Sequence, residues 1–473
     1  MAIENTHFGA CEIARLLQHC NSIYFVGIGG INMSSLALIS KQRGFCVGGS
    51  DRTETALTRR LQQEGICLFY GHKEEQVEAY DALVYTVAIS ADNPEYVRAK
   101  ERGIPCISRS DYMGYLMMDY ENRVGISGMH GKSTCTSMCA LTLLRGGADP
   151  TVLSGAALKE MGGAYRIGGR RHFVFEACEY MDSFLDFNPT VAVVLNVEMD
   201  HVDYFHSMEQ IMDSFSRFLA KTGTGGSAVL NGDDPRVMEL RKAYRGRVLT
   251  FGIDSPTADL RAVELKETGG CYSFDLLLFG QRFCHVALAV TGRYNVYNAL
   301  ATAGAAWLCG LSGEAIEDGL ASFSGAARRM EYRGSCRGAS LYDDYGHHPT
   351  EVKATLEGAR KMTAEGGRLF CVFQPHTYSR TAALLDRFGD AFSLVDRVWI
   401  LPIYPARETD SLGMSASCVA KAVGMHAVAT DGFSDAAERL VKELKQGDVA
   451  VIMGAGDSDR MFPLLMDEFA QKE

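Results

Sequence analysis

The sequence lacks the features that mark membrane-spanning, secreted and nucleic-acid-binding proteins. No part of its 473 residues approaches the roughly 18–20 consecutive apolar residues that a membrane-spanning helix needs. The 14 cysteines are scattered and none forms a C-x-x-C pair, so a reducing compartment fits them better than disulfide pairing or a zinc ribbon. The formal net charge is −11, which argues against a nucleic-acid or membrane-surface partner because both need a positive field.

Targeting signals and repeats are also missing. The N-terminus has no basic segment before an apolar run, so we expect no signal peptide. The chain contains no short repeat, low-complexity run or charged tail. These absences predict a cytoplasmic protein with no nucleic-acid or membrane partner, and we expect a monomer or a weak homodimer.

What the sequence contains is typical of a large α/β protein. Its hydrophobic content of 47% is ordinary for globular proteins, and at roughly 100–200 residues per domain its length predicts about three domains. Apolar strands, glycine turns and helical stretches alternate along the chain, which indicates parallel α/β domains. We place the three domains at residues 1–119, 120–325 and 326–473.

Individual elements follow from the same alternation. Residues 258–291 alternate apolar and polar side chains around glycines, which predicts antiparallel hairpins in a small added sheet of the central domain. We expect helices at 33–42, 133–144 and 295–309. We expect strands at 22–26, 45–50, 66–70, 82–87, 123–127, 173–176, 191–196, 341–343, 369–373, 397–401 and 449–453.

The strongest local signal is the glycine loop at residues 125–133, GISGMHGKS. A strand leads into glycines whose backbone N–H groups can surround a phosphate, and a Lys-Ser pair opens a helix. Lys132 would reach the phosphates of a nucleotide, and the Ser133 hydroxyl would bind Mg²⁺. The glycine spacing departs from the usual P-loop, so a plain strand–turn–helix is the alternative interpretation.

A second glycine turn, GIGGINMS, occupies residues 27–34, and Asp51 ends the next predicted strand. This arrangement resembles a dinucleotide-binding turn followed by an acid for a ribose hydroxyl. Asn32 stands where a third glycine is usual, which predicts a positive φ or a rearranged turn there. A bare glycine turn without a ligand explains the segment equally well.

Acidic and imidazole side chains follow several of the other predicted strands. Glu176 follows one strand and the Asp200-His201 pair follows another, where they could serve a metal and a transferring phosphate. The segment 343–349, DDYGHHP, could serve nucleotide or metal binding. A solvated carboxylate, a hydrogen-bonded loop histidine and a capped helix start at Pro349 are the respective alternatives.

Taken in order, these segments resemble the Mur ligases. The resemblance covers nearly the whole chain. It runs through GIGGINMS (27–34), GMHGKST (128–134), FEACEYMDSFL (175–185), LNVEMDHVDYF (195–205), GRYNVYNALA (292–301), RRMEYRG (328–334), DDYGHHPTEV (343–352), FQPHTYSRT (373–381) and GAGD (454–457).

The resemblance implies three domains with separate tasks. A Rossmann-like first domain would bind a UDP-sugar, a P-loop-like central domain would bind ATP and Mg²⁺, and a Rossmann-like C-terminal domain would bring an amino acid. The implied UDP-sugar residues are Gly27, Gly29, Gly30, Met33, Ser34 and Asp51.

The resemblance also assigns nucleotide, metal and amino-acid residues. Those implied for ATP are Gly128, Met129, His130, Gly131, Lys132, Ser133, Thr134, Asn295, Asn298, Arg329 and Asp344, with the two asparagines at the adenine. Ser133, Glu176 and His201 would hold metal, and Lys132, His201, Arg329 and Asp344 would be catalytic. His347, His348, His376 and Arg380 would receive the amino acid.

The implied reaction is ATP-dependent amide-bond formation in peptidoglycan precursor synthesis. ATP would phosphorylate the lactyl carboxylate of UDP-N-acetylmuramate, because a free carboxylate resists attack by an amine. L-alanine would then attack the acyl phosphate, and Lys132 and Arg329 would stabilise the negative charge that gathers. Closure of the C-terminal domain would exclude water.

Two further residues depart from the family pattern, and three alternative functions compete with the ligase interpretation. Cys178 replaces an acid of the family pattern, and Thr377 stands where some relatives have arginine, which leaves Arg380 as the clearer carboxylate clamp. A peptide-recycling ligase of the same family, an NAD-dependent oxidoreductase and an inactive nucleotide sensor are the rivals. The last would have lost Lys132, Glu176 or His201, and all three are present.

Overall fold

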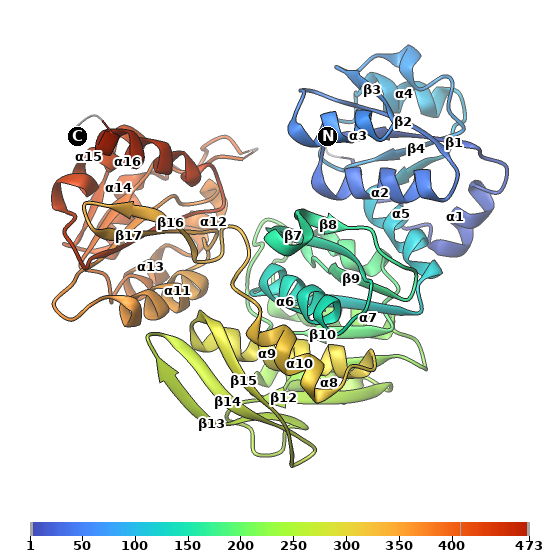
Figure 1. Ribbon diagram of the computed structural model, residues 1–473. Helices are drawn as coiled ribbons and strands as arrows, with labels where there is room; N and C mark the ends of the chain where they lie inside the picture. Colours follow the sequence, from blue (N-terminus) through green and yellow to red (C-terminus); the bar gives the residue numbers. More distant parts are fainter. Residues whose placement is uncertain (1–2, 407, 471–473) are drawn as a thin grey trace.

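Three separate sheets organise the chain into α/β domains (Figure 1). The computed structural model describes residues 3–406 and 408–470, so the outermost ends of the first and last predicted domains lie outside the described residues. Each sheet falls within one of the three predicted segments, although the boundaries between the segments stay predictions. In Figure 1 the first and C-terminal domains lie above the central domain, on its right and left.

The first domain is a parallel five-stranded sheet of order β3-β2-β1-β4-β5. The strands predicted in this region are confirmed. Its strands are β1 (Ser22–Val26), β2 (Cys46–Asp51), β3 (Cys67–Tyr70), β4 (Ala82–Tyr85) and β5 (Cys106–Ser108). Its helices are α1 (Ala10–Leu16), α2 (Ile31–Gln42), α3 (Ala56–Gln63), α4 (Pro94–Glu101) and α5 (Arg109–Leu116).

At the third-glycine position the structure has the rearranged turn, and not the positive φ at Asn32 that was the other expectation. Helix α2 begins at Ile31, two residues earlier than predicted, and its N-cap is Gly30. Asn32 therefore lies in the first helical turn and is not among the non-glycine residues with positive φ. The positive φ is at Gly27, where it is +80°. The turn is thus completed before Asn32, which needs no special conformation.

The central domain has a ten-stranded sheet of order β15-β14-β13-β12-β11-β10-β6-β9-β7-β8. Its strands are β6 (Asn122–Ser127), β7 (Thr151–Leu158), β8 (Gly163–Arg166), β9 (His172–Glu176), β10 (Val191–Val194), β11 (Ser227–Asn231), β12 (Arg247–Gly252), β13 (Leu260–Thr268), β14 (Cys271–Leu278) and β15 (Gln281–Thr291). Its helices are α6 (Lys132–Arg145), α7 (Met208–Ala220), α8 (Pro235–Ala243), α9 (Arg293–Leu308) and α10 (Gly313–Ala321).

The antiparallel hairpins predicted at 258–291 are present as β13, β14 and β15. They do not form a sheet of their own, because β13 pairs in parallel with β12 and so extends the central sheet. The predicted small added sheet is therefore an edge of the large one. Helices α9 and α10 pack against this extension and against α6.

The C-terminal domain is a six-stranded sheet of order β16-β17-β21-β18-β19-β20, in which only β16 is antiparallel. Its strands are β16 (Glu331–Cys336), β17 (Ala339–Asp344), β18 (Leu369–Phe373), β19 (Arg397–Ile400), β20 (Ala427–Ala429) and β21 (Val449–Met453). Its helices are α11 (Pro349–Met362), α12 (Tyr378–Ala383), α13 (Phe388–Ala391), α14 (Ala416–Val423), α15 (Phe433–Glu443) and α16 (Met461–Ala470).

The apolar cores do not follow the three sheets one to one. One core joins residues of the first domain to one face of the central sheet, and a second core fills the space between that sheet and helices α6, α9 and α10. The two faces of the C-terminal sheet have cores of their own. In the described part of the chain, no helix is both long and apolar enough to cross a membrane.

Candidate active site

The phosphate loop, residues 128–134, connects β6 to α6 and is packed too tightly for side chains at its glycines. Gly131 has a φ of +85°, and a Cβ there would lie 2.8 Å from the Asn298 Oδ1 atom. A Cβ on Gly128 would lie 3.0 Å from the Leu195 Cβ. Helix α6 has Gly131 as its N-cap and no side-chain cap. Its first N–H groups are therefore available to an anion.

Lys132 points back over this loop. Its Nζ lies 2.6 Å from the carbonyl oxygen of Gly128, 3.1 Å from that of Met129 and 3.0 Å from Glu179 Oε2. Burial lowers the pKa of the ammonium, but the charge of Glu179 outweighs that effect and the net pKa is raised. Lys132 is therefore a fixed cation at the place where phosphate oxygens would enter.

Glu179 begins a chain of charged contacts that reaches the C-terminal domain. Its buried carboxylate also pairs with His201, whose Nε2 lies 3.1 Å from Glu179 Oε1. The other ring nitrogen of His201 lies 3.0 Å from the Arg380 guanidinium, and Arg380 Nε donates to Asp200 Oδ1 at 3.0 Å. Burial raises the pKa of Asp200, but Arg380 outweighs it and the net pKa is lowered.

A second group of contacts joins Ser133 to Glu176 of the same domain and to Arg329 of the C-terminal domain. The Ser133 hydroxyl donates to Glu176 Oε2 at 2.8 Å, and the same oxygen accepts the Gly155 N–H at 2.9 Å. The guanidinium of Arg329, which precedes the C-terminal sheet, lies 3.2 Å from Ser133 Oγ. Hydroxyl and carboxylate oxygens at a phosphate loop are the ligands that Mg²⁺ prefers. Ser133 and Glu176 therefore fit a magnesium ion. His201, the third predicted metal residue, contacts Glu179 instead of this pair.

A cavity of about 370 Å³ lies beside the phosphate loop, between the central and C-terminal domains. Its lining includes these predicted nucleotide residues: His130, Gly131, Thr134, Asn295, Asn298, Arg329 and Asp344. Asn298 Nδ2 donates to Asn295 Oδ1 at 2.9 Å, which fixes both amides. Burial raises the pKa of Asp344, against the opposing effect of Arg329. Gly128, Met129, Lys132 and Ser133 do not line this cavity.

A larger cavity, about 800 Å³, lies between the first and central domains. The predicted residues Gly27, Gly29, Gly30, Met33 and Asp51 line it, together with Glu176. Ser34 does not line it, and its buried hydroxyl donates to the Ile28 carbonyl at 2.7 Å, so its role toward the UDP-sugar stays a prediction. Asp51 Oδ2 accepts the Gly29 N–H at 2.8 Å and thereby holds the glycine turn.

The four predicted amino-acid residues divide into two places. The rings of His347 and His376 lie 5.4 Å apart between centroids and are tilted by 53°, and Arg380 lies beside His376. His348 instead faces His130, with 4.7 Å between centroids. It is also the N-cap of α11, so the alternative interpretation of this segment as a capped helix start is confirmed for His348.

The paired imidazoles are neutral at physiological pH. Burial lowers the pKa of His347 to about 3, and burial together with the charge of Arg380 lowers that of His376 to about 4. Thr377 follows with a φ of +58° at the N-cap of α12. One fixed cation beside two uncharged rings is an arrangement that can accept a small molecule carrying a carboxylate.

Sequence reasoning did not single out several residues that the fold brings to these sites. Glu179 is fully buried between Lys132 and His201, and its only signal was the acidic segment that begins at Glu176. Arg109 lines the larger cavity, and no ion pair to it is found among the described residues. Burial lowers the pKa of Arg109. Nothing in its local sequence marks it, because it meets the cavity only through domain packing.

Three family models match successive parts of the chain. They are described as "Mur ligase family, catalytic domain" at residues 22–121, "Mur ligase middle domain" at 126–306 and "Mur ligase, glutamate ligase domain" at 328–456. Together they cover most of the chain in one order.

Individual relatives match over nearly their whole length. A protein of Caldicellulosiruptor bescii named UDP-N-acetylmuramate–L-alanine ligase is 40% identical over 456 residues, 96% of this chain and 100% of the relative. One of the same name from Lachnospira eligens is 41% identical, covering 92% and 95%. The crystal structure of UDP-N-acetylmuramate-alanine ligase from Thermotoga maritima aligns with a TM-score of 0.78 at 26% identity, covering 96% of this chain and 100% of that one.

Proposed function

The chain belongs to the Mur ligase family, and from that premise we propose that it is a UDP-N-acetylmuramate–L-alanine ligase. It joins L-alanine to the lactyl carboxylate of the UDP-sugar through an acyl phosphate and releases ADP and phosphate. We also propose that ATP and Mg²⁺ are required, and that the reaction takes place in the cytoplasm as part of peptidoglycan precursor synthesis.

The observation that carries this proposal is the position of Glu176. Its side chain lines the larger cavity and also accepts a hydrogen bond from Ser133 at the start of α6. The UDP-sugar cavity and the phosphate loop therefore meet at one carboxylate. A sugar carboxylate that reaches Glu176 lies next to the place where the terminal phosphate of ATP would be held, which is the geometry that carboxylate phosphorylation needs.

The nucleotide occupies the smaller cavity in this proposal. Asn295 and Asn298 present fixed amides to the base, and the uncapped start of α6 receives the phosphates. Lys132 exchanges its loop carbonyl contacts for phosphate oxygens, and Arg329 approaches from the C-terminal side. Mg²⁺ held by Ser133 and Glu176 would supply Lewis-acid neutralisation of phosphate charge.

L-alanine is received by His347, His376 and Arg380. The Arg380 guanidinium attracts the amino-acid carboxylate, and Asp200 fixes its orientation. Because the two imidazoles are neutral, they do not repel the amine that must approach the acyl phosphate. Arg380 also touches His201, so the amino-acid site and the phosphate site share one hydrogen-bonded chain.

The decisive experiment is phosphate release from ATP by the purified protein. It is run with UDP-N-acetylmuramate and, separately, L-alanine, L-serine, glycine or a tripeptide, with a no-sugar control. We expect release that requires both the sugar and L-alanine. Release with the tripeptide but not with L-alanine would assign the protein to peptide recycling instead, and release under no pairing would refute the proposal.

A further inference from the structure

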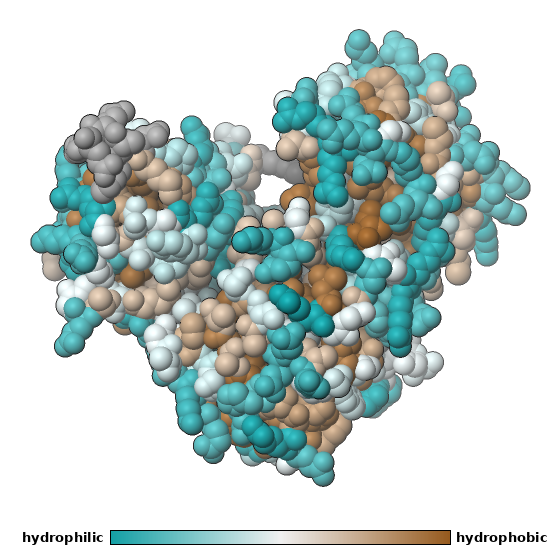
Figure 2. Space-filling model, in the orientation of Figure 1, coloured by the Kyte–Doolittle hydropathy of each residue, from teal (hydrophilic) through white to brown (hydrophobic). Residues whose placement is uncertain are grey.

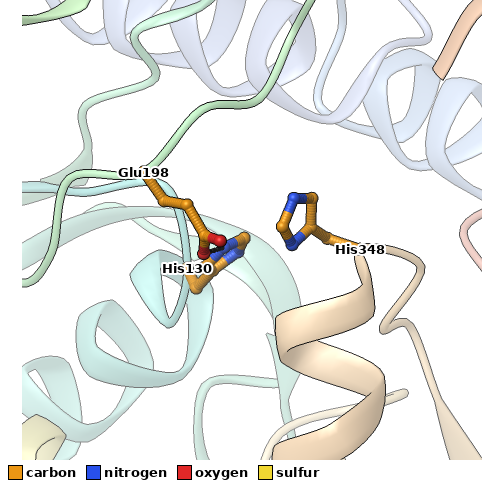
Figure 3. Close-up of side chains that lie close together, drawn as sticks. All are labelled: His130, Glu198 and His348. Atoms are coloured by element: carbon orange, nitrogen blue, oxygen red, sulfur yellow. Dashed lines mark hydrogen bonds and ion pairs between the residues drawn. The ribbon is translucent and has the colours of Figure 1, made fainter. Parts of the chain in front are cut away.

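His130, Glu198 and His348 converge at the edge of the smaller cavity from three separate segments (Figure 3). His130 belongs to the phosphate loop, Glu198 follows β10, and His348 caps α11 in the C-terminal domain. One potential metal-binding atom from each lies within 4.8 Å of the others. Two imidazoles and a carboxylate are a ligand set that zinc-like ions use and Mg²⁺ avoids.

The pair formed by His130 and Glu198 already has a suitable spacing. His130 Nε2 lies 3.1 Å from Glu198 Oε2. With metal bonds of about 2.0–2.1 Å in a tetrahedron, two ligand atoms stand roughly 3.3 Å apart. A metal ion can thus bridge this pair with little movement, and only the ring of His348 has to approach.

The two ligands of this pair are themselves held by neighbouring polar groups. Glu351 Oε1 lies 3.2 Å from His130 Nδ1, on the side of the ring away from Glu198, as an ion pair whose angle does not meet hydrogen-bond geometry. A carboxylate on the far nitrogen is the usual partner of a metal-bound histidine, because it fixes the tautomer and orientation of the ring. Glu198 accepts the Thr350 hydroxyl at 2.9 Å and also pairs with Arg387.

His348 supplies an independent observation that points to a ligand. Its side chain is fully buried, and its Nε2 has no hydrogen-bond partner among the described residues. Its Nδ1 accepts the Thr350 N–H at a long 3.3 Å. Metal binding through Nε2 moves the ring proton to Nδ1 and gives up that one long hydrogen bond.

The charge around the cluster also favours a cation. Two carboxylates, Glu198 and Glu351, flank His130. Two carboxylates on either side of one imidazole concentrate negative charge at the place where a divalent cation would bind.

We propose that His130, Glu198 and His348 form a binding site for a zinc-like transition-metal ion, with Glu351 orienting His130. Three protein ligands leave one position open, and it faces the smaller cavity, which His130 and Glu198 line. Because His348 comes from the C-terminal domain, the bound ion fastens that domain to the phosphate loop. The oxygen ligands at Ser133 and Glu176 remain a separate site for Mg²⁺.

The test uses Co²⁺ as a coloured substitute for Zn²⁺, on the full-length protein without an affinity tag and with saturating Mg²⁺. We expect one Co²⁺ per chain with the visible absorption of tetrahedral nitrogen and oxygen coordination, displaced by Zn²⁺. His348→Asn should weaken binding at least 100-fold, because asparagine keeps the helix cap but removes the imidazole. Glu351→Gln should weaken it by about 10–100-fold.

Two further variants keep the result interpretable. His19→Asn changes an exposed histidine of the first domain and should leave Co²⁺ binding unchanged. Glu198→Gln repeats the test if His348→Asn fails to fold, as judged by circular dichroism. The proposal is overturned if no Co²⁺ binds in the presence of Mg²⁺, if the band survives both ligand substitutions, or if it is the near-ultraviolet band of thiolate coordination.

Discussion

The central domain contacts its two neighbours through interfaces of opposite character. Its interface with the first domain is part of a continuous apolar core. Leu116 and Met117 of the first domain lie in that core with Phe173 and Phe175 of the central domain. Tyr120, at the junction between the two domains, stacks on Phe173 with 4.9 Å between ring centroids. Hydrophobic residues are also visible on the surface where these two domains meet (Figure 2).

The interface with the C-terminal domain consists largely of charged and polar contacts. Arg380 pairs with Asp200, Arg387 with Glu198, and Glu351 faces His130. The two apolar cores of the C-terminal domain contain only residues of that domain among those described. A hollow separates this domain from the first domain above the central one (Figure 2).

The difference indicates which domain moves. Separating the first two domains would expose a shared core, whereas separating the third breaks ion pairs whose partners can be exchanged for water or ligand charges. We therefore expect the first and central domains to move as one body and the C-terminal domain to open and close upon them. The following changes test this comparison.

The largest effect is expected for Lys132→Ala. Loss of a cation at a transferring phosphoryl group lowers kcat by about 10³–10⁵-fold, which corresponds to roughly 4–7 kcal/mol. Binding of UDP-N-acetylmuramate, measured by calorimetry, should stay nearly unchanged because that cavity is lined by other residues. The converse variant Asp51→Ala releases the Gly29 N–H and should raise the KM for the sugar more than that for ATP. A collapse of sugar affinity in Lys132→Ala would mean that the two interfaces are not independent.

Phe173→Ala tests the apolar interface. The ring is fully buried and packs against Tyr120, so its removal should lower the free energy of unfolding by about 3–5 kcal/mol. Differential scanning calorimetry should show the first and central domains melting earlier as one transition. Phe373→Ala, in the core of the C-terminal sheet, is the matched control and should shift only that domain's transition. Two separate early transitions in Phe173→Ala would contradict a single rigid body.

Asp200→Asn tests the charged interface. It keeps the shape of the side chain but removes the charge that pairs with Arg380. The free energy of domain closure should become less favourable by roughly 2 kcal/mol. The KM for L-alanine should rise about 10–30-fold. Small-angle scattering should show a larger radius of gyration, while the unfolding transition of the first two domains stays in place. An unchanged radius together with an unchanged KM would show that this ion pair does not hold the domain.

The pH dependence of closure follows from His130. Its pKa is raised to about 9 in the folded protein, above the ordinary value of about 6.5. Its charged contacts with Glu198 and Glu351 are therefore fully present below about pH 6.5 and are lost as pH rises through about 9. At about 1.4 kcal/mol per pKa unit, this shift sets an upper bound of roughly 3 kcal/mol on the loss, and Arg387 continues to pair with Glu198. Scattering profiles from pH 6 to 10 should show opening that His130→Asn abolishes; identical pH profiles would refute this account.

Cys178→Ser is expected to have the smallest effect. Burial raises the pKa of this thiol to about 11, so it is an uncharged group at the wall of the larger cavity. Serine preserves its size, and kcat/KM should change by less than about twofold. An inactive Cys178→Ser enzyme would show that the thiol takes part in the reaction.

Local features of the sequence predicted the fold well because glycine turns and strand patterns act over a few residues. The loops at 27–30 and 128–131 follow buried strands as expected. The helix begins two residues before its predicted start at Met33, because Gly30 serves as its N-cap. The hairpins were recognised, but their attachment to β12 depends on a pairing that spans the sheet edge.

The candidate site was predictable only where one segment supplies it. The phosphate loop and the two asparagines of α9 lie within single elements. Glu179 and Glu198 contact partners far away in the sequence, and Arg109 reaches its cavity only through domain packing. The burial of Glu179 between Lys132 and His201 has no local signal. The split between His347 and His348 arises because adjacent residues at a helix start point to different neighbours.

The uncapped start of α6 ties the stability of the protein to the anion that binds there. Fourteen residues of helix begin at a glycine that supplies no side-chain oxygen, so a bound anion would complete the hydrogen bonding of the first N–H groups. By linkage, a ligand that binds only the folded state adds about 2.7 kcal/mol at 100 times its Kd. With ATP as that ligand, as proposed, the protein should resist heat and proteolysis better when ATP is abundant than when it is scarce.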